Sequence, residues 1–109
     1  MTRRRAPLDM IAFHGTDGEE DSMQWFTTDE RHASQFGSVQ RYRVTSWEAV
    51  YIDCATDEDL AGEYGADADA ILMRIFRAEG KRPLVLRGWE GGEDVTTIYT
   101  GGAADVDEA

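Results

Sequence analysis

The sequence contains few of the residues that cross-link small domains or bind metals. Among 109 residues there are two prolines, two histidines and one cysteine. Because Cys54 is alone, no disulfide can form within the chain, which excludes a disulfide-stabilised secreted domain. A structural zinc site takes about four Cys or His ligands, and only Cys54, His14 and His32 are present. We therefore predict no metal site and expect Cys54 to be a small buried hydrophobe.

Basic residues and long apolar runs are also scarce. The chain has 11 Lys and Arg against 22 Asp and Glu, a net charge of −11. This charge repels nucleic-acid phosphates and disfavours direct binding of DNA or RNA, whereas it suits a protein target with a basic surface. The same acidity is expected of a DNA mimic, or of a protein from a saline habitat. The apolar run over 8–13 is too short, and too interrupted by Asp9, for a signal peptide or membrane span. We expect no membrane association and a cytoplasmic location.

What is present indicates one small α+β domain. The chain is 41% hydrophobic and includes three Trp, four Tyr and four Phe, enough for one core. We expect a single domain over 8–100, with a flexible arm over 1–7 and a flexible acidic tail over 101–109. Apolar runs and period-two patterns predict strands over 10–13, 23–27, 39–45, 47–53, 84–86 and 95–100. The strands do not alternate regularly with helices, which favours the α+β class.

Two short helices are predicted between these strands. Asp29 can cap the start of a helix over 29–35, which Gly37 would end. A second helix is predicted from apolar residues spaced to form one helical face, namely Ala68, Ile71, Leu72, Ile75 and Phe76. Gly80 can end this helix, whose role we expect to be packing. The acidic stretch over 17–21 is predicted to be a solvated turn.

Three short motifs carry residues suited to binding or chemistry. Phe13-His14-Gly15-Thr16 ends the first predicted strand. Trp25-Phe26-Thr27 lies in the second, and Phe36 follows Trp25 by eleven residues. Glu93-Asp94 comes directly before the last strand.

Each motif also has a purely structural interpretation. His14 can satisfy backbone groups at the end of its strand. Trp25 and Phe36 can be ordinary core aromatics, as we expect Phe26 to be. The Gly-Gly-Glu-Asp stretch over 91–94 has a composition typical of a turn.

The order and spacing of the three motifs resemble the ADP-ribosyltransferase superfamily of the diphtheria-toxin and poly(ADP-ribose) polymerase type. The resemblance covers residues 10–54 and 82–100 and extends to small phage-encoded members that act as anti-CRISPR proteins. It implies a compact split β-sheet core with two short helices. It also implies NAD as the donor and mono-ADP-ribosyltransferase activity on a protein target. Trp25 and Phe36 stand where the family usually has Tyr. The Glu or Gln that the family usually has two residues before its catalytic acid falls at Gly92 if Asp94 is that acid, or at Gly91 if Glu93 is.

The resemblance assigns a role to each binding residue. A flat cationic nicotinamide ring binds well between aromatic faces, and Trp25 and Phe36 would supply them. The backbone of Gly15 would hold the carboxamide, and His14 would bond a ribose. Thr16 completes the His-Gly-Thr motif.

One carboxylate is enough for the chemistry that the resemblance implies. The nicotinamide leaves as a neutral molecule through an oxocarbenium-like state, which a nearby anion stabilises. We assign this role to Asp94, with Glu93 second and Glu90 third. The alternative function is that of a non-catalytic acidic inhibitor or DNA mimic that binds a basic surface.

Overall fold

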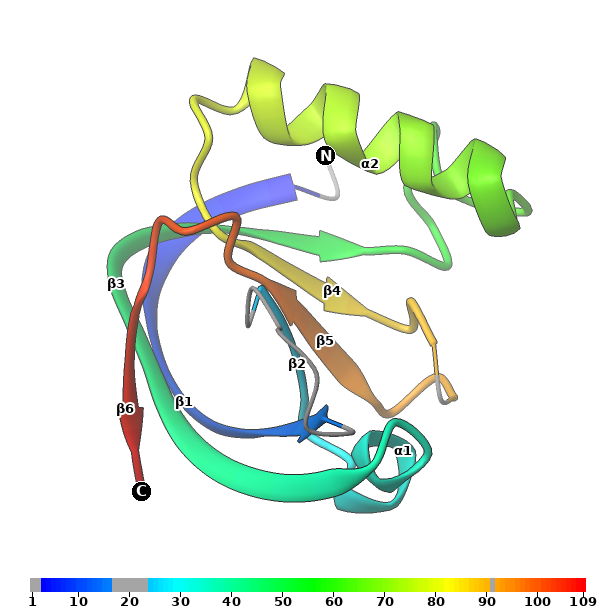
Figure 1. The fold of residues 1–109 in the computed structure, drawn as a ribbon. Helices are drawn as coiled ribbons and strands as arrows, with labels where there is room; N and C mark the ends of the chain where they lie inside the picture. The colour runs from blue at the N-terminus through cyan, green and yellow to red at the C-terminus, as the bar shows by residue number, and fades with distance from the viewer. Residues whose placement is uncertain (1–2, 17–23, 91) are drawn as a thin grey trace.

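Five of the six strands close into a small barrel. The computed structural model describes residues 3–16, 24–90 and 92–109. The strands lie in the order β1-β2-β5-β4-β3-β6, and an additional β1–β3 pairing closes the ring of five (Figure 1). The strands are β1 (Arg3–Thr16), β2 (Trp25–Thr27), β3 (Ser38–Asp53), β4 (Leu84–Arg87), β5 (Thr96–Tyr99) and β6 (Asp105–Glu108). The helices are α1 (Glu30–Ser34) and α2 (Gly65–Ala78).

The α+β class with two short helices is confirmed, but the arrangement of strands differs from the expected split core. Within the described ranges every strand belongs to one hydrogen-bonded sheet. The reason lies in β1 and β3, which are long, curved, and paired from Arg3↔Ile52 to Thr16↔Ser38. The other edge of β3 pairs with β6 at Tyr42–Thr45 and with β4 further on. Closure in this way leaves few unpaired strand edges.

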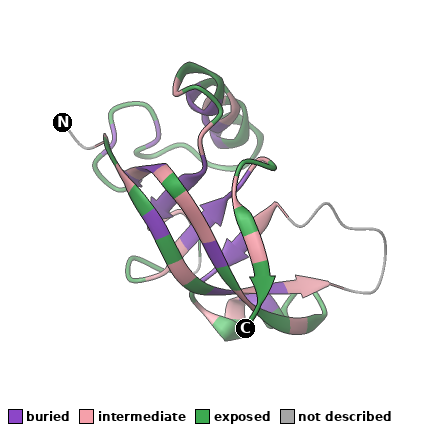
Figure 2. Cartoon of the chain, turned by 90° about the vertical axis from the view of Figure 1, so that its left-hand side faces the viewer, coloured by how far each residue is buried: buried purple, intermediate pink, exposed green. Residues whose placement is uncertain are grey.

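The structure corrects the expected flexible arm and tail. Residues 3–7 belong to β1 and pair with the end of β3. The four residues of β6 pair antiparallel with the first half of β3. Both strands are rich in charged residues, and this composition hides them from sequence patterns, because each lies at a surface where backbone pairing, and not side-chain burial, defines the element. The long strands show the corresponding mixture of buried and exposed positions in Figure 2.

The strands predicted over 39–45 and 47–53 form one element, with a bulge where they meet. Ala6 pairs with Ala49 and Leu8 with Ser46, so β3 carries one more residue than β1 between these pairs. The irregularity lies opposite Pro7, which has no N–H to donate to the ladder. Trp47, in the bulge, is 81% exposed. The bulge in β3 therefore lies where β1 lacks a backbone donor.

Two apolar clusters lie on opposite faces of the barrel wall. The interior cluster consists of Leu8, Ala12, Phe26, Val44, Ala49, Val85 and Ile98. The exterior cluster lies beneath α2 and includes Leu72, Ile75, Leu84, Leu86 and Tyr99. The predicted apolar face of α2 is confirmed, since Ala68, Leu72, Ile75 and Phe76 are buried. Cys54 is buried too, and burial, with the nearby carboxylates, raises its pKa to about 12. Its thiol is therefore neutral and unreactive at pH 7.

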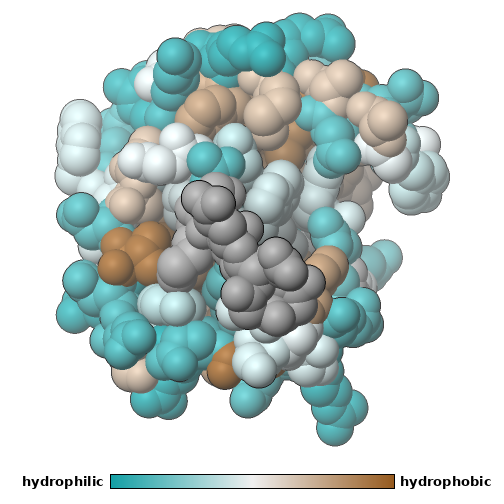
Figure 3. All heavy atoms as spheres, viewed as in Figure 1, coloured by the Kyte–Doolittle hydropathy of each residue, from teal (hydrophilic) through white to brown (hydrophobic). Residues whose placement is uncertain are grey.

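No helix in the described part of the chain is long and apolar enough to cross a membrane. The face viewed in Figure 3 is mostly hydrophilic, with small separate hydrophobic patches.

A buried ion pair fastens the start of β1. The Asp57 side chain is 2% exposed and accepts two hydrogen bonds from Arg3, at 2.8 Å from Nε and 3.0 Å from Nη2. Arg3 Nη2 also bonds Asp59, and Asp57 accepts from the Asp59 backbone N–H. Burial alone would raise the pKa of Asp57, but these hydrogen bonds outweigh it and hold the pKa below its usual value.

We expect Asp57→Asn to lower the free energy of unfolding by about 3 kcal/mol, because Arg3 loses its buried anion and keeps only the exposed Asp59 carboxylate. Urea denaturation measures this loss. The matched control is Asp9→Asn, which breaks the solvent-exposed pair with Arg43 and should change stability little. Equal effects of the two substitutions would contradict a dominant role for the Arg3–Asp57 pair.

The same pair predicts a pH dependence. The pKa of Asp57 is lower in the folded chain than in the unfolded chain. The contribution of its carboxylate to the free energy of unfolding is therefore complete above the unfolded pKa of about 3.9. It is lost as pH falls through the folded value. The difference in unfolding free energy between wild type and Asp57→Asn should therefore be constant above about pH 5 and shrink below about pH 4. A difference that grows on acidification would contradict this assignment.

Candidate functional site

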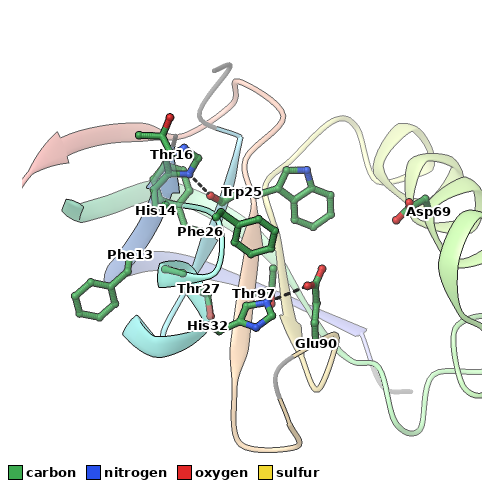
Figure 4. A pocket seen from close by; sticks show the side chains of 13 residues that line it. Phe13, His14, Thr16, Trp25, Phe26, Thr27, His32, Asp69, Glu90 and Thr97 are labelled. Atoms are coloured by element: carbon green, nitrogen blue, oxygen red, sulfur yellow. Dashed lines mark hydrogen bonds and ion pairs between the residues drawn. The ribbon is translucent and has the colours of Figure 1, made fainter. Parts of the chain in front are cut away.

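A cleft of about 490 Å³ lies beside α1, along β1, β2 and β5 of the barrel (Figure 4). Its lining comes from the end of β1, from β2 and β5, from the α1 segment, from the loop after β4 and from α2. The lining residues are Phe13, His14, Gly15, Thr16, Trp25, Phe26, Thr27, His32, Ala33, Phe36, Asp69, Glu90 and Thr97. All five residues that the sequence assigned to NAD binding (His14, Gly15, Thr16, Trp25 and Phe36) are among them.

Gly15 allows α1 to pack against the end of β1. A Cβ built on Gly15 would lie 1.9 Å from the Ala33 carbonyl oxygen and 3.2 Å from Phe36 Cβ. Asp29 caps the helix as predicted, accepting from the Arg31 backbone N–H at 3.0 Å. Because Gly15 has no side chain, the Ala33 carbonyl of the helix fits against it. This packing is a structural reason for glycine at this position, in addition to the contact with a ligand that the resemblance implies.

His14 is held by the neighbouring strand. Its Nδ1 lies 2.7 Å from the Trp25 carbonyl oxygen; since a carbonyl only accepts, Nδ1 carries the hydrogen. The side chain is nearly buried, and its ring lies 5.4 Å from that of Phe26. His14 therefore bonds the backbone at a strand end, as its structural interpretation predicted. The same residue also lines the cleft. Phe26 is in the barrel core, as predicted.

The two aromatic residues of the proposed sandwich each have an aromatic neighbour. The Trp25 ring stacks on Trp89, with 6.4 Å between centroids and 15° between planes, and also touches Tyr99. Phe36 is 57% exposed and lies edge-on to His32 at 5.6 Å. Both residues line the cleft from different elements. The cleft therefore has one indole that packing holds in place and one phenyl ring that remains open to solvent.

Of the three acidic candidates, Glu90 is the one at the cleft. Glu93 and Asp94 are exposed in the turn before β5, as the alternative turn interpretation expected, and neither belongs to the lining. Glu90 Oε2 accepts a hydrogen bond from His32 Nε2 at 3.0 Å. Trp89, which precedes Glu90, stacks on Trp25. This contact holds the chain beside Glu90 against the barrel. The role proposed for Asp94 or Glu93 stays a prediction, and the geometry favours Glu90.

Two threonines, opposite each other on neighbouring strands, contribute the buried hydroxyls of the cleft. Thr27 of β2 pairs with Thr97 of β5, and both are at most 6% exposed. Thr27 Oγ1 accepts from the Asp29 backbone N–H at 3.1 Å. Thr97 Oγ1 is buried and has no hydrogen-bond partner within the described residues. Burying a hydroxyl in this state costs about 1–3 kcal/mol. Thr27 belongs to the Trp25-Phe26-Thr27 motif, whereas Thr97 had no sequence signal beyond its strand propensity.

The charged residues that line the cleft are acidic. Glu90 and Asp69 contribute carboxylates, while Lys and Arg are absent from the described lining. Asp69 comes from α2, for which the sequence predicted only a packing role. Across the described part of the chain, no group of three or more His, Cys, Asp or Glu is placed to hold a metal ion. The site therefore suits a cationic or neutral organic group.

Comparison with family models, with curated proteins and with solved structures finds no match to this chain.

We expect Gly15→Ala to lower the free energy of unfolding by about 1–3 kcal/mol, since the added methyl must displace α1 from β1. Chemical denaturation measures this change. Ser38→Ala, an exposed position that pairs with Thr16, is the control and should stay within about 0.5 kcal/mol of wild type. If Gly15→Ala proved as stable as Ser38→Ala, the close contact with the Ala33 carbonyl would be wrong.

Proposed function

We propose that the chain is an NAD-dependent mono-ADP-ribosyltransferase that modifies a protein, and that the cleft binds the nicotinamide end of NAD. The observation that carries this proposal is the convergence of five residues, named from separate motifs, on one cleft. These residues come from β1, from β2 and from the segment after α1, and direct contacts bring them together at the cleft.

The cleft has the size and chemistry for a nicotinamide riboside group. Its volume of about 490 Å³ is within the usual range for small-molecule sites. The ring of nicotinamide in NAD is flat and positively charged. Trp25 and Phe36 offer aromatic surface to such a ring, and Glu90 and Asp69 offer negative charge. The diphosphate has no cationic partner in this lining, so the fit is to the nicotinamide end.

Glu90 is the carboxylate best placed to assist transfer. In the proposed step the bond between the nicotinamide nitrogen and the ribose carbon breaks, and its electron pair stays on the nitrogen. Neutral nicotinamide leaves, and a nucleophilic side chain of the target forms the new bond to the ribose carbon and releases a proton to solvent. Positive charge develops on the sugar, where a carboxylate stabilises it. His32 would orient Glu90 through their 3.0 Å hydrogen bond.

A second candidate is a non-catalytic inhibitor of a protein with a basic surface. The net charge of −11 favours it, as does the hydrophilic face in Figure 3. In this case the chain would bind its partner without consuming NAD. A phage effector against host defence such as CRISPR is compatible with either candidate.

NAD should stabilise the protein and be consumed by it. At 100 times its Kd, a ligand adds about 2.7 kcal/mol to the free energy of unfolding, which thermal denaturation detects. We expect Glu90→Gln to reduce this shift only in part, since Asp69 and the aromatic rings remain, and to lower nicotinamide release at least about 100-fold, because the anion is needed as charge develops.

Asp94→Asn and Glu93→Gln are the matched controls, since both residues are exposed and outside the cleft lining. Both should release nicotinamide at the wild-type rate. If either control loses activity while Glu90→Gln retains it, the carboxylate that assists transfer is Asp94 or Glu93 and not Glu90. If wild type shows neither a shift nor nicotinamide release at millimolar NAD with candidate targets, the enzyme proposal is wrong and the second candidate stands.

A further inference from the structure

A second cavity, of about 260 Å³, adjoins the barrel interior and has no role in the proposed mechanism. Strands β1, β3, β4 and β5 line it, and Met10, Tyr51 and Val85 connect it to the interior apolar cluster. Thr96 lines this cavity whereas Thr97 lines the cleft, and consecutive residues of a strand point to opposite faces of a sheet. At β5 the two cavities therefore lie on opposite faces, so the second is a site of its own and not an extension of the cleft.

The charge of this cavity is opposite to that of the cleft. Arg4 and Arg87 contribute two positive charges to the lining, and Asp53 contributes one negative charge. The cleft, in contrast, has the carboxylates of Glu90 and Asp69 and no Lys or Arg among its described lining residues. The chain as a whole has a net charge of −11. A lining with net positive charge in so acidic a protein favours an anionic ligand.

Arg4 differs from the arginines on either side of it in β1. Arg3 and Arg5 each form ion pairs with two carboxylates. Within the described residues Arg4 has no carboxylate partner, and its guanidinium lies 4.5 Å from the centroid of the Tyr51 ring. Because Arg4 is exposed, the N–H donors of this guanidinium are open to an anion from solvent.

The strand register places the two arginines of the cavity on one face of the sheet. Arg4 of β1 pairs with Tyr51 of β3, which pairs in turn with Val85 of β4. Arg87 follows Val85 by two residues, so its side chain points to the same face. Two long side chains can therefore approach one ligand from the two sides of β3.

Two contacts hold these basic groups at the cavity. The Tyr51 hydroxyl donates to the Pro7 carbonyl oxygen at 2.8 Å, which fixes the ring over which Arg4 lies. Arg87 Nη1 lies 3.0 Å from Asp53 Oδ2. A guanidinium has five N–H donors, so this ion pair leaves Arg87 with donors for a ligand.

We propose that this cavity binds a small organic oxyanion, a carboxylate or a phosphate on an apolar body about the size of one ring. The oxyanion lies between Arg4 and Arg87, because arginine donors match the geometry of both groups. Met10 and Val85 offer apolar surface to the body. The volume of about 260 Å³ is just below the usual range for drug-sized ligands, which limits the ligand to this size. The net charge of −11 repels nucleic acids and acidic proteins, which leaves a small molecule.

NMR titration of the whole chain with benzoate, phenyl phosphate and benzamide tests this site. Benzamide is the neutral analogue of benzoate, and wild type should bind the tighter of the two anions at least about tenfold more tightly than benzamide. The largest amide shifts should be those of Tyr51, Val85 and Arg87. Tighter binding of phenyl phosphate would identify a phosphate ligand, and tighter binding of benzoate a carboxylate ligand.

Two variants test the arginines. Arg4→Gln and Arg87→Gln should each weaken binding of the tighter anion about tenfold, since each removes one guanidinium from the cavity. Both side chains are exposed, so both variants should melt close to wild type. Arg41→Gln is the matched control, because it makes the same change at an exposed strand position outside this lining. It should leave the affinity unchanged.

Three results would overturn the inference. The first is equal loss of affinity in Arg4→Gln and Arg41→Gln, which would indicate a general effect of net charge. The second is equal affinity of wild type for the two anions and for benzamide. The third is that the largest shifts occur at Trp25 in the cleft. None of these results bears on NAD binding, so the proposed function is tested separately.

Discussion

The pairing of β1 with β3 is the constraint on which the other elements depend. Because the two strands run antiparallel from Arg3↔Ile52 to Thr16↔Ser38, their curvature decides where the ring of strands closes. At one end the pairing presents the His-Gly-Thr motif to β2 and α1. At the other end Arg3 is fastened to Asp57. The candidate site and the buried ion pair are thus the two ends of one long strand pair.

The cleft is built from contacts that each have a structural purpose. Gly15 makes room for the Ala33 carbonyl, His14 bonds the Trp25 carbonyl, and the stack of Trp25 on Trp89 holds the loop that carries Glu90. A cavity fixed by its own supporting contacts costs little to organise when a ligand binds. The same side chains that stabilise this region therefore also give the cavity its shape.

The sequence predicted those elements in which buried and exposed side chains follow a regular pattern along the chain. The apolar spacing of α2, the Asp29 cap and the core position of Phe26 are local signals, and each is confirmed. The barrel closure and the strand over residues 3–7 were missed, because partners distant in sequence define them. The acidic candidate depended on the path of the loop after β4, which places Glu90 and not Asp94 at the cleft. The binding motifs identified five of the lining residues, but no pattern distinguished Thr97 from other strand threonines.

The topology also affects how the chain assembles during synthesis. The first residues of β1 have their partners at the end of β3, close to residue 50, so they stay unpaired until that part of β3 has been made. The parallel contact of β3 with β4 must then wait for α2, which connects them. Folds that depend on such distant pairings form slowly. The nascent chain consequently presents the apolar residues Leu8 and Ala12, later enclosed by the barrel, to the surrounding water before their partners are available.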